Sequence, residues 1–258
     1  MRNLKIAVFF NECKDNIFEI SEKIKKFFAD NGITYLETTE DIPNSDFVLA
    51  VGGDGTILKY SKAALKFGKP IIGLNNGSLG FLTSLNIDQL DVLKRIFTGE
   101  YKIKKRMILE IQLSDGRVLD AFNDVVITRE SSSQIVNFEI QKENEKYSFR
   151  ADGIIAATPT GSTAYSLSAG GPVLDSSLNC VVLTPVCPHS LAARPLVLSA
   201  DEEIKISYDL KRLENVVISI DGKDVMRADE SGAITIKKSE NTADTVHFFD
   251  NFFKKLKF

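Results

Sequence analysis

A glycine-rich loop with a carboxylate at its centre is the first feature with chemical meaning. Gly52, Gly53 and Gly55 surround Asp54, and Thr56 follows, directly after an apolar stretch that predicts a strand. Glycine lets the backbone approach a ligand closely, and N–H groups at such a turn and at the next helix start bind phosphate. A structural turn is the alternative, since Asp-Gly pairs are common in turns. The strand-to-helix context favours a ligand site.

Two common nucleotide-binding motifs do not fit this loop. The dinucleotide fingerprint requires a third glycine where this chain has Leu58. The P-loop motif requires Ser or Thr after a Gly-Lys pair, but Gly68-Lys69 is followed by Pro70. The loop therefore predicts a phosphate-binding site of another class.

A second polar stretch, residues 158–171, reads TPTGSTAYSLSAGG. Its small and hydroxylated residues supply many hydrogen-bonding groups with little bulk, as close contact with a sugar or phosphate requires. Ser162 or Thr163 is a candidate cap for a short helix over Thr163–Ala169 whose start would face an anion. Tyr165 offers a ring for stacking on a base. A helix-capping loop with a buried tyrosine is the alternative.

Three short polar pairs complete the candidates. Asn123-Asp124 interrupts the apolar run AFNDVVI. An amide beside a carboxylate suits ribose hydroxyls, but a β-bulge explains the pair equally well. Asp152-Gly153 precedes the second stretch, with a tight turn as its alternative, and Asp221-Gly222 predicts a hairpin turn.

The first 98 residues are expected to position the glycine loop on an α/β layer. Apolar residues from Ile17 to Phe28 fall on one helix face, which Asn16 or Asp15 can cap and Gly32 can end. Alternating strands and helices imply an open, mostly parallel sheet. The predicted strands are Lys5–Phe10, Ile33–Leu36, Asp46–Val51 and Pro70–Leu74, and the predicted helices are Asn16–Asp30, Ile57–Phe67 and Asp88–Phe97.

Residues 99–240 are expected to form a β-rich domain that binds the dinucleotide. Turn signals such as Asp115-Gly116 separate short apolar runs, and Thr163–Ala169 is the one helix-like insertion. The predicted strands are Met107–Leu113, Val118–Thr128, Ile135–Gln141, Lys146–Arg150, Gly153–Ala157, Cys180–Thr184, Arg194–Leu198, Glu203–Tyr208, Val216–Ile220 and Ala233–Lys237.

The tail, residues 241–258, is too apolar to remain solvated. We expect Asp244–Phe258 to form a terminal helix that packs back on the N-terminal domain. Its apolar residues are Phe248, Phe249, Phe252, Phe253, Leu256 and Phe258.

Composition places the chain among ordinary globular proteins. Of its 258 residues, 43% are hydrophobic and 26% are charged, which excludes a disordered or fibrous chain. Lys and Arg number 32 and Asp and Glu 35, so the net charge is −3. That balance disfavours sequence-independent binding to nucleic acid.

The cysteines, the histidines and the hydropathy pattern limit the cellular location and the metal binding that we expect. Cys13, Cys180 and Cys187 form an odd, sparse set, which argues against a disulfide framework and favours the cytoplasm. His189 and His247 lack zinc-site spacing, so we expect no metal held by protein ligands alone. The start of the chain is too briefly apolar for a secretory signal, and no run approaches the ~18 apolar residues of a membrane helix. We therefore expect no membrane partner.

The motifs together resemble those of the NAD kinases. The family's GGDG loop matches Gly52–Gly55, its Asn-Asp/Glu pair matches Asn123-Asp124, and its longest motif matches residues 158–171 without a gap. NxGxLGFL matches Asn75–Leu82, and a late Asp-Gly pair matches Asp221-Gly222. The longest motif is highly specific, whereas diacylglycerol and sphingosine kinases and phosphofructokinases share loops similar to GGDGT. Ser78 departs from the pattern, because relatives often carry a larger polar residue there.

The resemblance implies an activity and partners. A bacterial-type NAD kinase transfers a phosphoryl group from ATP, or from polyphosphate, to the 2′-hydroxyl of the adenosine ribose of NAD. It also implies a homo-oligomer, dimer or tetramer, and Mg²⁺ that arrives with ATP. A lipid kinase that shares the GGDG loop and a catalytically silent NAD(P)-binding sensor are the alternative functions.

The resemblance further assigns roles by position. Asp54 would be the general base on the 2′-hydroxyl, Gly52, Gly53 and Gly55 would face the triphosphate, and Asn123 and Asp124 would hold ribose hydroxyls. The dinucleotide pocket would be lined by Asp152, Thr163, Ala164, Tyr165, Ser166 and Ser168. Lys59 and Arg150 are candidate phosphate contacts, and Cys187 and Lys223 would lie at the outer edge of the pocket.

Overall fold

The computed structural model describes residues 3–11, 16–77, 80–131, 135–210, 215–250 and 255. The chain divides into two compact units. Unit 1 comprises Met1–Lys105 and Ala243–Phe258, and unit 2 comprises Arg106–Thr242. Strands β6 (Lys102–Gln112) and β17 (Gly232–His247) contribute residues to both units.

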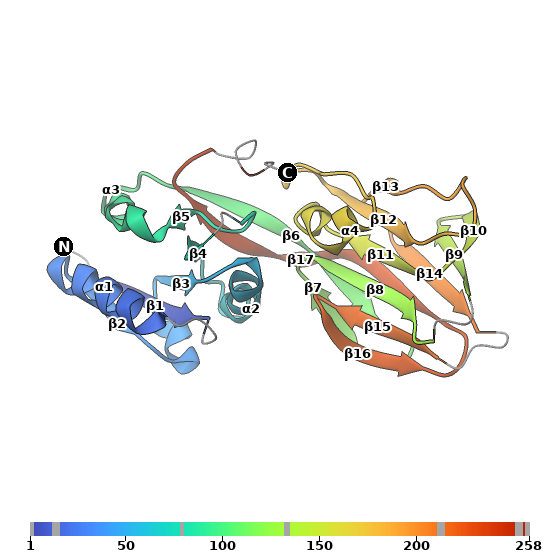
Figure 1. The fold of residues 1–258 in the computed structure, drawn as a ribbon, viewed down its shortest axis with the longest axis horizontal. Helices are drawn as coiled ribbons and strands as arrows, with labels where there is room; N and C mark the ends of the chain where they lie inside the picture. Colours follow the sequence, from blue (N-terminus) through green and yellow to red (C-terminus); the bar gives the residue numbers. More distant parts are fainter. Residues whose placement is uncertain are drawn as a thin grey trace. The chain divides into compact units, whose positions relative to one another are not determined.

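Unit 1 is an α/β layer built on a parallel sheet, as the alternation of strands and helices predicts (Figure 1). Its strands run in the order β2-β1-β3-β4, and each neighbouring pair is parallel. Their bounds are β1 Leu4–Phe10, β2 Ile33–Leu36, β3 Phe47–Val51 and β4 Ile71–Asn75. The two-residue strand β5 (Leu85–Asn86) pairs in parallel with β4.

The helices of unit 1 bury an apolar stripe. In α1, Ile20, Ile24 and Phe28 recur every four residues and are buried in the same core as β1, β3 and β4. Burying each such side chain stabilises the unit by about 1.5–3 kcal/mol. The burial of this stripe confirms the predicted helix face. The helices are α1 Ile17–Asp30, 3₁₀ helix η1 Thr39–Asn44, α2 Asp54–Leu65, 3₁₀ helix η2 Ile87–Lys94 and α3 Arg95–Thr98.

Two local predictions in unit 1 are wrong, and one element was not predicted. The helix expected over Asp88–Phe97 is the 3₁₀ turn η2 followed by α3, with non-helical dihedrals at Gln89. The side chain of Gln89 accepts the N–H of Asn86 at 3.0 Å, which favours a tight first turn. The helix expected from Ile57 begins at Asp54, and η1 carries no apolar period that would have predicted it.

The tail begins as a strand rather than as the expected helix. Residues 244–247 belong to β17, where Thr245 pairs in parallel with Ile71 of β4. Val246 is fully buried and Phe248 is 8% exposed, whereas Phe249 is 39% exposed. Pairing with β4 therefore makes residues 244–247 a strand. The predictions for Phe252, Phe253, Leu256 and Phe258 lie outside the described residues, as do those for Cys13, Asp15 and Ser78.

Unit 2 is β-rich, as predicted, and contains two antiparallel arrangements (Figure 1). One sheet has the order β13-β12-β11-β8-β15-β16, and the other strands include β10-β9-β14-β17 and the β6–β7 pair. The bounds are β7 Val118–Ala121, β8 Asp124–Arg129, β9 Val136–Lys142, β10 Glu145–Ala151, β11 Gly153–Ala157, β12 Cys180–Val186, β13 Leu196–Ser199, β14 Ile204–Asp209, β15 Val216–Ile220 and β16 Lys223–Ala228.

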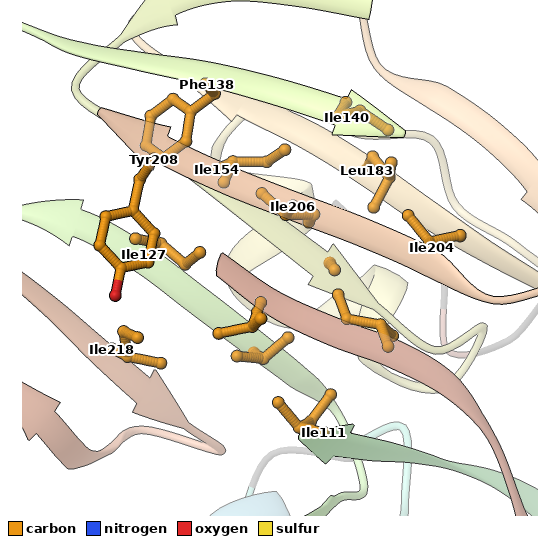
Figure 2. Packing of buried hydrophobic residues seen from close by; sticks show 14 of the residues in the cluster. Ile111, Ile127, Phe138, Ile140, Ile154, Leu183, Ile204, Ile206, Tyr208 and Ile218 are labelled. Atoms are coloured by element: carbon orange, nitrogen blue, oxygen red, sulfur yellow. The ribbon is translucent and has the colours of Figure 1, made fainter. Parts of the chain in front are cut away.

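The core of unit 2 lies between side chains of these two sets of strands. Ile204, Ile206 and Tyr208 alternate along β14 with more exposed residues and point into this core. Figure 2 shows them facing residues of the six-stranded sheet, as expected for two packed sheets. The six-stranded sheet contributes Ile127, Ile154, Leu183 and Ile218.

One strand prediction in unit 2 is wrong at a candidate site residue. The expected strand Val118–Thr128 is two strands, β7 and β8, with a break at Phe122 and Asn123. β16 was not predicted as a strand, although its turn was: Asp221 and Gly222 have φ of 49° and 74°. Both residues lie in the left-handed region that such hairpin turns require.

Candidate functional site

The first group of candidates lies where β3 ends in unit 1. The N–H of Gly52 donates to the carbonyl of Leu74 (2.9 Å), and Gly53 caps α2. The carbonyl of Gly53 accepts the N–H of Thr56 at 3.0 Å. Asp54 therefore stands in the first turn of a helix, at the carboxyl end of a parallel strand, where open α/β sheets bind ligands.

The carboxylate of Asp54 binds the backbone of a second loop. The N–H of Phe81 donates to Oδ2 of Asp54 (2.8 Å) and that of Leu82 to Oδ1 (3.0 Å). A Cβ on Gly80 would lie 2.1 Å from Oδ1 of Asp54, so this contact requires glycine at position 80. Since a carboxylate has about four lone-pair sites, both oxygens keep acceptor capacity for a further proton donor.

The three glycines of the loop differ in their structural role. A Cβ on Gly52 would lie 2.7 Å from Oγ1 of Thr56, so packing explains that glycine. A Cβ on Gly53 or Gly55 would meet no atom of the described residues within 4 Å, and neither residue has a positive φ. Glycine costs about 0.5–1 kcal/mol relative to alanine within a helix. The fold itself therefore does not explain Gly53 and Gly55, which leaves room for a close ligand.

Lys59 lies one turn further along α2. Its side chain is exposed, and Nζ stands 5.0 Å from the centre of the Tyr60 ring. Tyr60 in turn stacks on Phe9 at 4.4 Å. The lysine is thus held at the surface by a cation–π contact and remains accessible to an anion.

The second group of candidates lies in unit 2, and Asp221 organises it. Its carboxylate accepts three N–H groups: those of Phe122 (2.9 Å), Asn123 (2.6 Å) and Asp124 (3.1 Å). These bonds take the backbone out of the β ladder and explain the break between β7 and β8. Asn123 is half-buried and Asp124 is 5% exposed, so the pair is held firmly.

The stretch 158–171 packs directly against this pair. The N–H of Thr158 donates to the carbonyl of Asn123 (2.8 Å), and its hydroxyl donates to that of Phe122 (2.8 Å). A Cβ on Gly161 would lie 2.0 Å from the carbonyl oxygen of Asn123. The structure therefore brings together two motifs that the sequence separates by more than thirty residues.

The helix-capping prediction for this stretch is wrong. The helical part is a 3₁₀ turn η3, Gly161–Thr163, and a four-residue helix α4, Tyr165–Ser168. Ala164 is its N-cap, and no side chain caps it. The hydroxyl of Ser162 instead donates to the carbonyl of Pro159 (2.7 Å) and accepts the N–H of Leu174 (3.0 Å). Hydroxyl groups here tie the loop to itself, because such groups compete with helical bonding.

The predicted pocket residues of this stretch are partly accessible. The ring of Tyr165 is 44% exposed and Ser168 is exposed, while Thr163 and Ala164 are half-buried. Ser166 is fully buried, and its hydroxyl bonds that of Thr184 at 2.8 Å. Its side chain therefore supports the fold of the turn.

The remaining candidates of unit 2 lie at strand ends. Asp152 forms a half-buried ion pair with Arg129 at 2.8 Å, and Lys223 is exposed at the start of β16. Arg150 is exposed and lines a cavity of about 770 Å³ with His189. Cys187 is exposed with φ of 46°, whereas burial raises the pKa of the Cys180 thiol.

Four residues that shape these two groups were not among the predicted site residues. They are Gly80, Arg129, Asp221 and Lys255. Gly80 and Asp221 lie in motifs that the resemblance had marked, so that signal could have found them. Arg129 and Lys255 stand in no motif, and each acts through a partner that is distant in sequence.

Within the described ranges, no three His, Cys, Asp or Glu side chains are grouped so that they could hold a metal ion. No helix in those ranges is both long and apolar enough to cross a membrane.

A carboxylate on a glycine loop, at the carboxyl end of a parallel sheet, is typical of enzymes that handle phosphate groups. The family model described as the ATP-NAD kinase N-terminal domain matches residues 37–101. The model described as the ATP-NAD kinase C-terminal domain matches residues 122–248. The fold and the motifs therefore define a phosphotransferase.

Curated relatives identify the family. An NAD kinase of Caldanaerobacter subterraneus subsp. tengcongensis is 36% identical, and the match covers 95% of this chain and 96% of the relative. An NAD kinase of Clostridium botulinum (strain Loch Maree / Type A3) is 40% identical over 93% of this chain and 85% of the relative. The chain belongs to the NAD kinase family, and the lipid kinase alternative is not supported.

Solved structures share the fold. A yeast NADH kinase complexed with NADH superposes with a TM-score of 0.83 at 23% identity, covering 98% of this chain and 85% of that one. An NAD kinase from Archaeoglobus fulgidus in complex with ATP has a TM-score of 0.79 at 26% identity, covering 98% of this chain and 97% of that one. The α/β and β-rich organisation predicted from the sequence is confirmed.

Proposed function

We propose that this protein transfers the terminal phosphoryl group of ATP to the 2′-hydroxyl of the adenosine ribose of NAD. The 2′-oxygen forms a bond to the γ-phosphorus, the bond from that phosphorus to the β–γ bridging oxygen breaks, and ADP leaves. The proton of the hydroxyl goes to a carboxylate. The observation that carries this proposal is Asp54, fixed in the first turn of α2 by the N–H groups of Phe81 and Leu82.

Asp54 is the proposed general base. Phosphoryl transfer depends mainly on positioning and charge stabilisation, with one group accepting the proton of the nucleophile. Two backbone donors restrict the rotation of this carboxylate, so little orientational freedom remains to be lost when substrate binds. Gly53 and Gly55 have no steric partner at Cβ and suit close approach of the triphosphate, and Lys59 suits a phosphate contact.

NAD recognition is assigned to unit 2. Asn123 and Asp124 would hold ribose hydroxyls, because an amide and a carboxylate both pair with hydroxyl groups. The exposed ring of Tyr165 suits stacking on a base, and the ion pair to Arg129 orients Asp152. Thr163, Ala164 and Ser168 would line the pocket, with Arg150, Cys187 and Lys223 further out. Ser166 would support that wall from beneath.

Several finer points belong to the same proposal. Mg²⁺ would enter with ATP, and carboxylate oxygens such as those of Asp54 are the donors it prefers. When bound, it neutralises charge on the phosphates. ATP is the proposed donor and polyphosphate a second donor to be assayed. A cytoplasmic location follows from the sparse cysteines, and a homo-oligomer from the family resemblance.

A coupled assay tests the activity. The pure protein is incubated with NAD and Mg-ATP, and NADP is detected with an NADP-specific dehydrogenase. We expect NADP to accumulate with time and enzyme concentration. Tight NADP binding without any NADP formation would instead favour a sensor and would refute the enzyme.

Asp54→Asn tests the proposed base. We expect kcat to fall at least ~10²-fold, the low end for loss of a general base. Asparagine keeps only one acceptor for the two N–H groups, so amide exchange at Phe81 and Leu82 is measured alongside to separate chemistry from loop release. Asp91→Asn is the matched control, because its side chain is 83% exposed and pairs only locally, with Lys94. A near-normal kcat in Asp54→Asn would remove Asp54 from the role.

A further inference from the structure

A lysine of the tail reaches the loop that holds Asp54. Lys255 is 9% exposed, although lysine is rarely buried without partners. Its Nζ donates to the carbonyl of Phe81 at 2.9 Å and to that of Thr83 at 2.7 Å. Two hydrogen bonds of this buried ammonium group thus go to one short backbone segment.

The same segment binds Asp54 on its other side. The carbonyl of Phe81 and the N–H of Leu82 belong to one peptide group. Lys255 donates to that carbonyl, and that N–H donates to Oδ1 of Asp54 at 3.0 Å. A single peptide plane therefore links the ammonium group to the carboxylate.

The hydrogen bonds at the two ends of this peptide group strengthen each other. Hydrogen bonds in a chain polarise one another, and bonds to charged groups are about twice as strong as neutral ones. An ammonium group on the carbonyl makes the N–H a better donor to the carboxylate. The carboxylate of Asp54 is therefore held more firmly in the orientation at which these donors point.

Other hydrogen bonds also hold this backbone segment in place. A change at Lys255 is therefore transmitted to Asp54 through a rigid backbone. The hydroxyl of Thr83 donates to the carbonyl of Gly80 (2.8 Å), and the N–H of Ser84 donates to that of Gly73 (2.7 Å). Ser84 also donates its hydroxyl to the carbonyl of Val246. Removing the Lys255 charge would then act first on the Phe81–Leu82 and Thr83–Ser84 peptides, and the first of these donates to Asp54.

We propose that Lys255 is a positioning residue for Asp54, acting through the Phe81–Leu82 peptide. This inference rests on the proposed role of Asp54 as the general base. Lys255 would not touch substrate; it would set the orientation of the carboxylate that does. The competing explanation is that Lys255 merely attaches the tail to unit 1.

Lys255→Met and Lys255→Arg separate the two explanations. In Lys255→Met we expect kcat and kcat/KM for NAD to fall together by about 10–100-fold, since small misplacements of reacting groups have effects of that size. KM for NAD and for ATP should change less than about twofold, because no ligand contact is lost. Lys255→Arg keeps the charge and the donors and should recover part of kcat.

Lys102→Met is the matched control. Lys102 also anchors the tail, through Asp250 at 2.7 Å, but both side chains are exposed and neither bonds the Phe81–Thr83 segment. We expect this variant to keep wild-type kcat. If Lys255→Met lowers the melting temperature yet leaves kcat unchanged, Lys255 is only an attachment point and the proposal is overturned. Equal losses of kcat in both methionine variants would overturn it as well.

A readout independent of activity covers the remaining cases. Amide exchange at Phe81 and Leu82 should accelerate in Lys255→Met and remain slow in Lys102→Met. If Lys255→Met does not fold, the comparison is made on Lys255→Gln, which keeps a donor without the charge. If the wild-type protein makes no NADP, the proposed function fails, while faster exchange would still support the link. Unchanged exchange overturns the link whatever the activity.

Discussion

Replacing Asp221 by asparagine tests whether one carboxylate holds the Asn123-Asp124 pair. The carboxylate accepts the N–H groups of Phe122, Asn123 and Asp124 at 2.9, 2.6 and 3.1 Å. Asparagine is nearly isosteric and tolerates the φ of 49° at this position, so the backbone itself should not change. What changes is the charge and one of the two acceptor atoms.

The expected loss follows from these contacts. A hydrogen bond to a charged group contributes about 1.5–3 kcal/mol. The asparagine oxygen replaces Oδ1 and still serves two N–H groups, but its amide meets the N–H of Phe122 donor to donor. One bond is lost and two are weakened, so we expect unit 2 to lose about 2–4 kcal/mol. At about 2–4 °C per kcal/mol, the melting temperature should fall by about 4–16 °C.

The assay compares thermal unfolding with kinetics. Because the Asn123-Asp124 pair is assigned to NAD, KM for NAD should rise more than KM for ATP in Asp221→Asn. Asp224→Asn is the matched control, since Asp224 is exposed, lies in the same hairpin and accepts the hydroxyl of the half-buried Ser219 at 2.7 Å. We expect it to change stability by less than about 0.5 kcal/mol. If the two variants have the same melting temperature and the same KM for NAD, the role given to Asp221 is refuted.

Three further outcomes are expected. Gly80→Ala should lower kcat by about 10²-fold, because its Cβ would lie 2.1 Å from Oδ1 of Asp54. Gly116→Ala is the comparison for backbone strain without this contact, because its φ is 86° and no described atom lies within 4 Å of its Cβ; equal kcat in the two variants would contradict the contact. Deleting Asp244–Phe258 should destabilise unit 1 in urea, since Val246 and Phe248 lose burial at about 1.5–3 kcal/mol each; an unchanged midpoint would disprove it. In a Cys13→Ser background, a thiol reagent should label Cys187 quickly, and NAD should slow that labelling; Cys180 should stay unlabelled until unfolding, because burial raises its pKa and the reactive thiolate is scarce.

Much of the local structure follows from the sequence. The four-residue spacing of Ile20, Ile24 and Phe28 predicts the buried face of α1, and the alternation in β14 predicts its buried side. Asp221-Gly222 predicts a hairpin turn because few residues adopt positive φ. Such features depend on near neighbours along the chain, so the sequence by itself determines them.

Tertiary contacts decided what local patterns could not. The apolar tail predicts a helix from residue 244 onward, but pairing with β4 makes residues 244–247 a strand. The run from Val118 to Thr128 has the composition of one strand, but a carboxylate 97 to 99 residues away breaks it at Asn123. The spacing of apolar residues in these two segments reveals neither β4 nor the carboxylate as a partner.

The candidate site likewise combines features that the sequence determines with features that only the folded structure decides. The sequence located the glycine loop, the Asn123-Asp124 pair and the stretch 158–171, since each motif is contiguous. It did not reveal that Asp54 binds the N–H groups of Phe81 and Leu82, or that Lys255 binds the carbonyl of Phe81. A motif fixes which groups are present, whereas their partners are backbone atoms that carry no residue identity. Only the folded chain brings those atoms within hydrogen-bonding distance.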